Sequence, residues 1–104
     1  MIDRGEDLSQ FKEKLYEQFG LLGRAISSPR RLELLDLLCQ GECSVDLLAE
    51  EMGLGSSNVS QHLRILKEAK LVEFTRDGLY VRYHISDPVV AEFWIAFRKL
   101  AMSR

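Results

Sequence analysis

Residues 55–74 read GSSNVSQHLRILKEAKLVEF, and their apolar side chains recur at the spacing of an α-helix. At about 100° per residue, Val59, Leu63 and Leu66 share one side of such a helix. The opposite side is polar and comprises Ser57, Gln61, Arg64 and Glu68, with Ser60 and Lys67 at its edges. Serine is a poor helix former, so a merely solvated face would normally hold other residues. Short hydrogen-bonding groups and cations are the side chains that contact phosphates and base edges in a DNA major groove.

The polar face has a second interpretation, a solvated helix surface without a DNA partner. The segments before and after the helix decide between these two interpretations. Serines also cap helices, so a solvated surface helix accounts equally well for the stretch taken alone. A short helix is predicted directly before it, from the cap candidate Ser44 to Gly53. A tight turn through Gly55 then leads to the cap candidate Ser56. Two short helices joined by a glycine-bearing turn, over about 45–69, form a helix-turn-helix.

The residues that follow change to the period of a β-strand. Apolar and polar side chains alternate across residues 72–85, on both sides of Arg76-Asp77-Gly78. Asp-Gly between two alternating runs is the strongest short-range signal of a β-hairpin. We therefore predict a two-stranded wing with Arg76 and Tyr80 beside its tip. From there both side chains would reach an adjacent DNA backbone or minor groove, so the context favours DNA recognition over a solvated surface.

Longer amphipathic helices enclose this motif. The first spans about residues 7–26, and the next begins at the cap candidate Ser28 with Pro29 in its first turn. The last helix opens at Pro88. The first and last helices each carry an apolar face wider than a small core needs, although covering the core is the alternative role. We predict that these faces form the interface of a homodimer through Phe11, Leu15, Phe19, Val90, Phe93, Trp94 and Phe97.

Length and composition describe one globular domain over residues 1–104. Hydrophobic residues make up 46% and charged residues 29%, which excludes intrinsic disorder. No apolar run is long enough to cross a bilayer, and the polar start MIDRGEDLSQ is unlike a signal peptide, so we predict a cytoplasmic protein without a membrane partner. The net charge of −2 is unevenly distributed: residues 29–55 carry two basic and six acidic side chains, whereas residues 56–85 carry five basic and three acidic ones. The basic part coincides with the polar helix and the wing.

The run PRRLELLDLLCQGECSVDLLAEEMGLGSSNVSQHLRILKEAKLVEFTRDGLYVRYHI, residues 29–85, resembles the ArsR/SmtB family of winged-helix transcriptional repressors. Its most diagnostic pieces are SxxSQHLxxLxxAxLV, residues 57–72, and the GxYVxY wing, residues 78–83. The resemblance implies a mainly α-helical fold with a small β-hairpin, a homodimer built by the terminal helices, and a small effector that releases the repressor from double-stranded operator DNA. With the wing included, the expected DNA-binding residues are Ser56, Ser57, Asn58, Ser60, Gln61, His62, Arg64, Arg76 and Tyr80.

One position departs from the family pattern at the end of the recognition helix. The family usually has glycine where this chain has Lys70, in the sequence EAKLV. Either a non-glycine residue occupies a left-handed backbone conformation there, at some cost in free energy, or the turn has a different geometry.

The metal sites of the family are poorly matched. Arsenic- and cadmium-type members have a Cys-x-Cys pair where this chain has Ser44 and Asp46, which lack the thiolates that a soft ion needs. Zinc- and cobalt-type members use carboxylates and histidines of the last helix, where this chain offers only Asp87 and Glu92. We therefore predict no metal-ligand set. The two histidines are interpreted as packing or hydrogen-bonding residues: His62 and His84.

The two cysteines, Cys39 and Cys43, are candidate thiol sensors of a reactive sulfur or redox signal. The helix dipole and Glu42 would disfavour the Cys39 thiolate, whereas a following helix N-terminus would favour that of Cys43. The alternative is that both are small, half-buried apolar residues. The leading helix and the wing also resemble family members that carry a C-terminal rhodanese-like domain, and this likeness favours a link to sulfur chemistry. Residues 1–104 do not include such a domain.

Two other classes of function agree less well with the sequence. A winged helix that docks on a protein and has lost DNA binding is favoured by the acidic net charge. An enzyme is disfavoured because the sequence offers no group of nucleophile, base and orienting residue.

Overall fold

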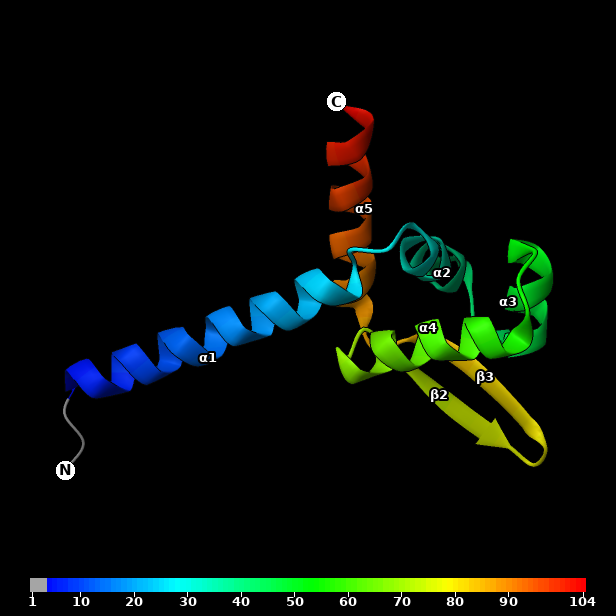
Figure 1. The fold of residues 1–104 in the computed structure, drawn as a ribbon, viewed down its shortest axis with the longest axis horizontal. Helices are drawn as coiled ribbons and strands as arrows, with labels where there is room; N and C mark the ends of the chain where they lie inside the picture. The colour runs from blue at the N-terminus through cyan, green and yellow to red at the C-terminus, as the bar shows by residue number, and fades with distance from the viewer. Residues whose placement is uncertain (1–3) are drawn as a thin grey trace.

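The computed structural model of the protein describes residues 4–104. The elements follow in the order α1 (Arg4–Ala25), α2 (Pro29–Gln40), β1 (Cys43–Ser44), α3 (Val45–Met52), α4 (Ser56–Glu68), β2 (Val72–Asp77), β3 (Tyr80–Ile85) and α5 (Pro88–Met102). Helices α2, α3 and α4 form a body with the β2–β3 hairpin beside it, whereas α1 and α5 extend from that body in two directions (Figure 1). The predicted winged helix-turn-helix is confirmed, with α3 and α4 as its two helices and the hairpin as its wing.

The core lies where α2, α3 and α4 meet each other and the start of β2. Its fully buried large side chains are Leu34, Leu35, Leu38, Leu48, Val59, Leu63, Leu66 and Val72. The inner face predicted for α4 is confirmed, since all three of its apolar residues belong to this set. Burial of each such side chain contributes roughly 1.5–3 kcal/mol. The inner face therefore fixes α4 against the body and turns its polar face outward.

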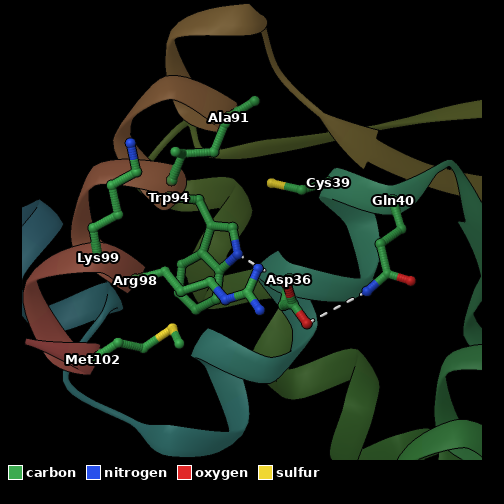
Figure 2. Close-up of a pocket in the computed structure, with 9 residues that line it drawn as sticks. Asp36, Cys39, Gln40, Ala91, Trp94, Arg98, Lys99 and Met102 are labelled. Carbon is green, nitrogen blue, oxygen red and sulfur yellow. Dashed lines mark hydrogen bonds between the residues drawn. The ribbon is translucent and has the colours of Figure 1, made fainter.

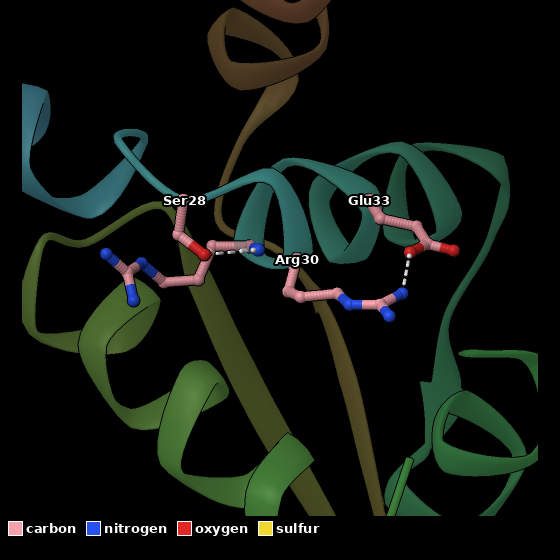
Figure 3. Close-up of polar contacts among 4 residues, drawn as sticks. Ser28, Arg30 and Glu33 are labelled. Atoms are coloured by element: carbon pink, nitrogen blue, oxygen red, sulfur yellow. Dashed lines mark hydrogen bonds and ion pairs between the residues drawn. The ribbon is translucent and has the colours of Figure 1, made fainter. Parts of the chain in front are cut away.

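Helix α2 begins as its sequence predicts. The Ser28 hydroxyl accepts a hydrogen bond from the backbone N–H of Arg31 at 3.3 Å, and proline follows the cap at the first helical position. On the outer surface of the first turn, Arg30 Nη1 lies 3.2 Å from Glu33 Oε1 (Figure 3). Both of those side chains are about half exposed, so the pair contributes little.

The cap predictions for α3 and α4 have different outcomes. The Ser44 hydroxyl accepts a hydrogen bond from the Leu47 N–H at 3.2 Å, which confirms Ser44 as the cap of α3. The prediction of Ser56 as the cap of α4 is wrong, because Gly55 occupies that position and makes no side-chain cap. Ser56 is instead the first helical residue, and its hydroxyl donates to Asp46 Oδ1 at 3.2 Å. This bond joins the start of the recognition helix to α3.

The wing spans the residues that the sequence predicts, with β2 over Val72–Asp77 and β3 over Tyr80–Ile85. The last residue of β2, Asp77, pairs with Tyr80, so the loop consists of Gly78 and Leu79, and Gly78 has the positive φ of 63° that such a tight loop needs. A third strand was not predicted: β1 pairs antiparallel with β3 and gives the order β1-β3-β2. Its two residues are too few for an alternating pattern to reveal.

The first of the two alternatives for Lys70 is confirmed, because this residue has a left-handed φ of 62°. A side chain in that conformation costs roughly 1–2 kcal/mol. Two hydrogen bonds hold the turn in place: the Leu71 N–H donates to the Leu66 carbonyl at 3.0 Å, and the Ser86 hydroxyl donates to the Lys70 carbonyl at 2.8 Å. The same turn leads directly into β2 and thus sets the wing beside α4.

Helix α1 stands apart from the body. Residues 11–20 are all exposed, and only its C-terminal end enters the core, where Ala25 is 1% exposed (Figure 1). The radius of gyration is 16.4 Å, compared with about 13 Å for a compact chain of this length. The excess comes from the protruding helix. Within residues 4–104, no helix combines the length and the apolar character that crossing a membrane requires.

Candidate nucleic-acid interface

The outer face of α4 is open to solvent along its whole length. Its exposed residues include Ser56, Ser57, Asn58, Ser60, Gln61 and Arg64. Four of the first five residues of the helix have short polar side chains, and the residue between them on the inner side, Val59, is fully buried. Small side chains at the N-terminal half let the backbone approach a groove closely, and the positive end of the helix dipole lies there as well.

Arg64 is the exposed cation of this face, whereas Lys67 at its edge is half-exposed. Its Nε atom lies 3.5 Å from Oε1 of Glu68, one turn further along the helix. Both side chains are largely exposed, at 78% and 63%, so this ion pair is weak and screened by water. The guanidinium is therefore available for a phosphate or for the paired acceptors of guanine.

His62 lies at the inner edge of α4 and is only half-exposed, as the sequence predicts for a packing or hydrogen-bonding residue. Its Nδ1 atom is 3.4 Å from Nη1 of Arg31 in α2. Because the guanidinium can only donate, Nδ1 acts as acceptor and the ring proton belongs on Nε2. Burial, followed by the charges of Arg31 and Arg30, lowers the pKa of His62 below its usual range. The neutral ring is thus the favoured form.

Arg31 is a positioning residue that the sequence did not reveal. Its Nε donates to the Ala25 carbonyl at 2.6 Å, and its Nη2 donates to the Arg24 carbonyl at 3.0 Å. Both carbonyls lie in the last turn of α1, where acceptors have no partner in the next helical turn, and the Arg24 carbonyl also accepts from the Ser27 hydroxyl at 2.7 Å. One side chain therefore joins the protruding helix, α2 and, through His62, the recognition helix. Only the tertiary arrangement brings these three helices to one guanidinium, so no spacing in the sequence signals it.

The wing presents its two predicted residues at the far end of the hairpin. Arg76 is exposed, and Tyr80 is 73% exposed beside the two-residue loop. The Lys67 ammonium lies 5.0 Å from the centre of the Phe74 ring, which links the end of α4 to β2. This contact packs the end of α4 against β2, and the hairpin runs beside α4 (Figure 1).

The two thiols do not share a site. Cys39 lines a hollow between α2 and α5, whereas Cys43 lines a different one beside β3. Burial raises the pKa of Cys39, and the Asp36 carboxylate raises it further. For Cys43 the expected activation is wrong: burial raises the pKa of its thiol more than the hydrogen bond from the Ser44 backbone lowers it. Both cysteines are free thiols with a disfavoured thiolate.

The positions of the family's metal sites have other uses in this chain. Ser44 caps α3, Asp46 accepts from Ser56, and the Asp87 carboxylate caps α5 by accepting from the Val89 N–H at 2.8 Å. Within residues 4–104, no three histidine, cysteine or acidic side chains gather as a metal-ion site would require. His84 Nδ1 lies 2.9 Å from the Ile85 carbonyl. This contact supports the interpretation of His84 as a hydrogen-bonding residue.

The predicted dimer residues fall into two groups. On α1, Phe11 is 67% and Phe19 is 51% exposed. On α5, Val90 is 6% exposed and belongs to the core of a single chain, and Trp94 is directed to α2, where its Nε1 donates to Asp36 Oδ1 at 2.9 Å. The predicted residue Phe93 is exposed, and it shares one side of α5 with the exposed Val89 and Leu100.

Comparison with known proteins agrees with this geometry. Residues 28–73 match the family described as "Bacterial regulatory protein, arsR family". The chain is also 37% identical over 89 residues to the HTH-type transcriptional regulator Rv0081 of Mycobacterium tuberculosis, a match that covers 85% of this chain and 78% of that relative. The chain belongs to the ArsR family. Its predicted class, a winged helix-turn-helix transcriptional regulator rather than an enzyme, is confirmed at the level of the family.

Two further relatives show which part of a longer regulator this chain resembles. The HTH-type transcriptional regulator Rv0324 of Mycobacterium tuberculosis is 36% identical over 93 residues, which cover 89% of this chain but only 41% of the relative. The solution structure of the homodimeric winged helix-turn-helix DNA-binding domain Mb0332 of Mycobacterium bovis superimposes with a TM-score of 0.83 and 36% identity, over 86% of this chain and 83% of that domain. The fold of the present chain is therefore that of a DNA-binding domain.

Proposed function

We propose that this ArsR-family protein is a homodimeric transcriptional repressor that binds operator DNA through α4 and the wing, and that an effector releases it. The observation that carries this proposal is the two-sided character of α4. Its inner face is fully buried at Val59, Leu63 and Leu66, while its outer face is a solvent-exposed strip of short polar side chains with one weakly paired arginine. A bacterial regulator of this kind would act in the cytoplasm, where its DNA lies.

Each part of the interface has a separate role on DNA. Gln61 and Arg64 have the donors and acceptors that distinguish base pairs in the major groove. Arg76 and Tyr80 would contact the phosphates or the minor groove beside it, which fix the register of the protein without reading sequence. The neutral His62 would offer its Nε2–H, since Arg31 occupies the Nδ1 side.

A second copy of the chain would cover the exposed side of α1. Phe11 and Phe19 are the kind of large apolar side chains that an isolated soluble helix does not expose. The related Mycobacterium bovis domain is a homodimer. A two-fold dimer would present two copies of α4 to successive major grooves, roughly 34 Å apart on one side of the duplex.

Release requires an effector that changes the distance or orientation between the two copies of α4. A metal ion or a reactive sulfur species remains the sequence-based expectation for it. The raised pKa of both thiols argues for slow sulfur chemistry, because the thiolate is the reactive form.

The experiment that tests this function is a fluorescence-anisotropy titration of the purified chain onto its own promoter DNA across a series of salt concentrations. A scrambled duplex of equal length is the matched control. Sequence-selective binding that weakens steeply with salt is expected, since each neutralised phosphate releases counterions. Equal affinity for both duplexes, or none for either, would instead support a winged helix that docks on a protein, which the acidic net charge favours.

A further inference from the structure

A hollow of about 420 Å³ opens between α2 and the second half of α5 (Figure 2). This volume is within the range of about 300–1,000 Å³ that small-molecule sites occupy. Trp94 lies at its centre, with Met102 on the same helix and Asp36 on the facing one (Figure 2). Ile95 of α5 also lines it. The DNA interface and the proposed dimer face use none of these side chains as their own contacts. The hollow is called the α2–α5 pocket below.

The pocket lies on the side of α5 that faces away from the proposed dimer interface. At about 100° per residue, Trp94, Ile95 and Met102 fall on one side of the helix and Phe93 and Leu100 on the other. Figure 1 shows the same separation, since α1 and α2 lie on opposite sides of α5. A partner subunit packed on α1 and on the Phe93 side would therefore leave the α2–α5 pocket open.

The charges around the pocket are unbalanced in favour of an anion. Arg98 and Lys99 stand on the α5 wall near the end of the helix, with the Arg98 guanidinium directed to the Asp36 side and the Lys99 ammonium on the other side of Trp94 (Figure 2). Neither forms an ion pair within residues 4–104. Asp36 is the one acidic residue of the lining, and its two oxygens are already engaged: Oδ1 accepts from Trp94 Nε1 at 2.9 Å, and Oδ2 accepts from Gln40 Nε2 at 3.4 Å. The lining thus carries two cations and one carboxylate, a net positive charge that favours an anionic ligand.

The remaining wall is apolar and incompletely covered. Ile95 is 55% exposed and Met102 is 75% exposed, and the indole of Trp94 is half-exposed between them and α2. A ligand that covered these side chains would remove apolar surface from water, which favours binding. Two cations beside an aromatic and aliphatic wall suit a molecule that has a negative end and an apolar body.

We propose that the α2–α5 pocket binds a small organic carboxylate with an aromatic or aliphatic body. Arg98 binds the carboxylate, Lys99 adds positive charge at the other edge of the pocket, and Trp94, Ile95 and Met102 contact the body. The assignment makes this pocket the effector site of the repressor, a consequence that rests on the function proposed above, whereas the binding itself does not.

The pocket is placed to transmit binding to the DNA interface. The Trp94–Asp36 hydrogen bond is a direct polar link between α5 and α2, and a ligand body beside the indole displaces or reorients it. Helix α2 shares the core with α4, and α5 carries the Phe93 side of the proposed dimer interface. A shift of α5 against α2 thus changes how the two recognition helices are placed relative to one another.

The first experiment measures binding without DNA. Trp94 is the only tryptophan of the chain, so its intrinsic fluorescence reports on this pocket alone. Phenylpropionate is the probe, and a saturable change with a Kd below about 1 mM is expected for a ligand of its size. Phenylpropionamide, the neutral isostere, should bind at least ten-fold more weakly. Equal binding of the two compounds would overturn the anion assignment, and no saturable change with either would overturn the site.

Variants localise the response. The double variant Arg98→Gln/Lys99→Gln should lose at least ten-fold in affinity for phenylpropionate, because it removes both charges and keeps polar side chains of similar length. Lys12→Gln/Lys14→Gln removes the same charge from the distant half of α1 and should change the Kd by less than about two-fold. An equal loss in the two double variants would show that net charge, and not the pocket, attracts the probe.

The last arm adds promoter DNA. Saturating phenylpropionate should weaken operator binding at least ten-fold in the natural chain and leave the Arg98→Gln/Lys99→Gln variant unaffected. Probe binding with unchanged operator affinity would overturn the effector role and leave the site. A chain that binds the probe but shows no selective DNA binding even without it would overturn the proposed repressor, and the two failures are thereby distinguished.

Discussion

Helices α1 and α4 are both solvent-exposed in one chain, but their exposed sides have opposite chemistry. The outer side of α4 is made of serines, an asparagine, a glutamine and an arginine, with its apolar residues buried. The exposed side of α1 carries Leu8, Phe11, Leu15 and Phe19, and its middle residues contact no other element closely enough to be covered. Exposure alone thus does not identify an interface. The kind of atom that is exposed indicates whether the partner is a nucleic acid or a protein.

The two helices also differ in what holds them in place. Helix α4 is fixed by its buried face and by Ser56, which donates to Asp46. Helix α1 is held mainly at its end, by the buried Ala25 and by the Arg31 side chain that binds its last carbonyls. A recognition surface needs a defined orientation before it meets DNA, whereas a dimer helix acquires its support from the partner.

The largest effect is expected for a charge placed in the α1 face. Phe19→Glu removes an apolar contact from both subunits of a two-fold dimer, and at roughly 1.5 kcal/mol or more per side chain the dimer Kd should rise at least about 100-fold. Sedimentation equilibrium measures this directly, and selective operator binding should be lost with the dimer. Gln10→Glu, which adds the same charge on another side of α1, is the control. A natural chain that stays monomeric at micromolar concentration would refute the assignment of this face.

A smaller effect is expected on the α4 side. Arg64→Ala should weaken operator binding by about ten-fold to 100-fold, the value of one well-placed arginine contact, without changing the dimer Kd. Anisotropy on the promoter duplex and sedimentation on the same sample separate the two quantities. Arg104→Ala removes one cation beyond the end of α5 and should leave operator affinity unchanged. If Arg64→Ala weakened the dimer instead, the two helices would not have the separate roles given to them here.

Substitutions at two residues with a left-handed backbone, Lys70 and Gly78, should change the stability of the chain and not its DNA binding. Lys70→Gly relieves the left-handed backbone at that position and should stabilise the chain by at most about 1 kcal/mol, since the added flexibility of glycine offsets part of the gain. Gly78→Ala should have the opposite sign, a loss of roughly 1–2 kcal/mol, because an added Cβ there meets no atom within 4 Å and only the backbone conformation opposes it. Urea unfolding measures both changes. Equal signs for the two variants would contradict the backbone explanation.

The smallest effect is expected at the Arg31 side chain, which links the end of α1 to His62 of α4. The pKa of His62 should lie below 6.5 in the folded chain, because burial and the nearby arginines disfavour the imidazolium. The unfolded chain then binds the proton first as the pH falls, so stability decreases below about pH 6.5 until the folded pKa is passed. Arg31→Gln should raise the pKa of His62 and reduce that decrease, as followed by NMR titration. Arg82→Gln, a substitution in the wing, should not move it.

Much of the fold was predictable because it rests on local patterns. Helical spacing identified the buried face of α4, and a serine followed by proline marked the start of α2. Alternation around Asp-Gly marked the wing. Ser56 was misassigned because serine is a common cap, and here a preceding glycine takes that position while the hydroxyl binds an aspartate ten residues away in the chain.

The predictions that could not be made from sequence all depend on which helices meet. Val90 looked like an interface residue, since an apolar position on an amphipathic helix does not reveal whether it faces its own core or a partner. The thiol of Cys43 was expected to be activated by the helix that follows, but burial has the larger effect on its pKa. Arg31 showed no pattern at all, because its three partners come from α1 and α4.

The sequence by itself determined the family, the order of the elements and the chemistry of each surface, because period, caps and turn residues act over a few neighbours along the chain. Tertiary structure alone decided which side of each helix is covered. It joined α1 to α4 through one arginine, and it placed two cations that have no ion-pair partner within residues 4–104 beside Trp94 in the α2–α5 pocket. These arrangements come from the packing of segments that are distant in the sequence. The burial of each side chain and the charges around it are set by neighbours that only the fold brings together.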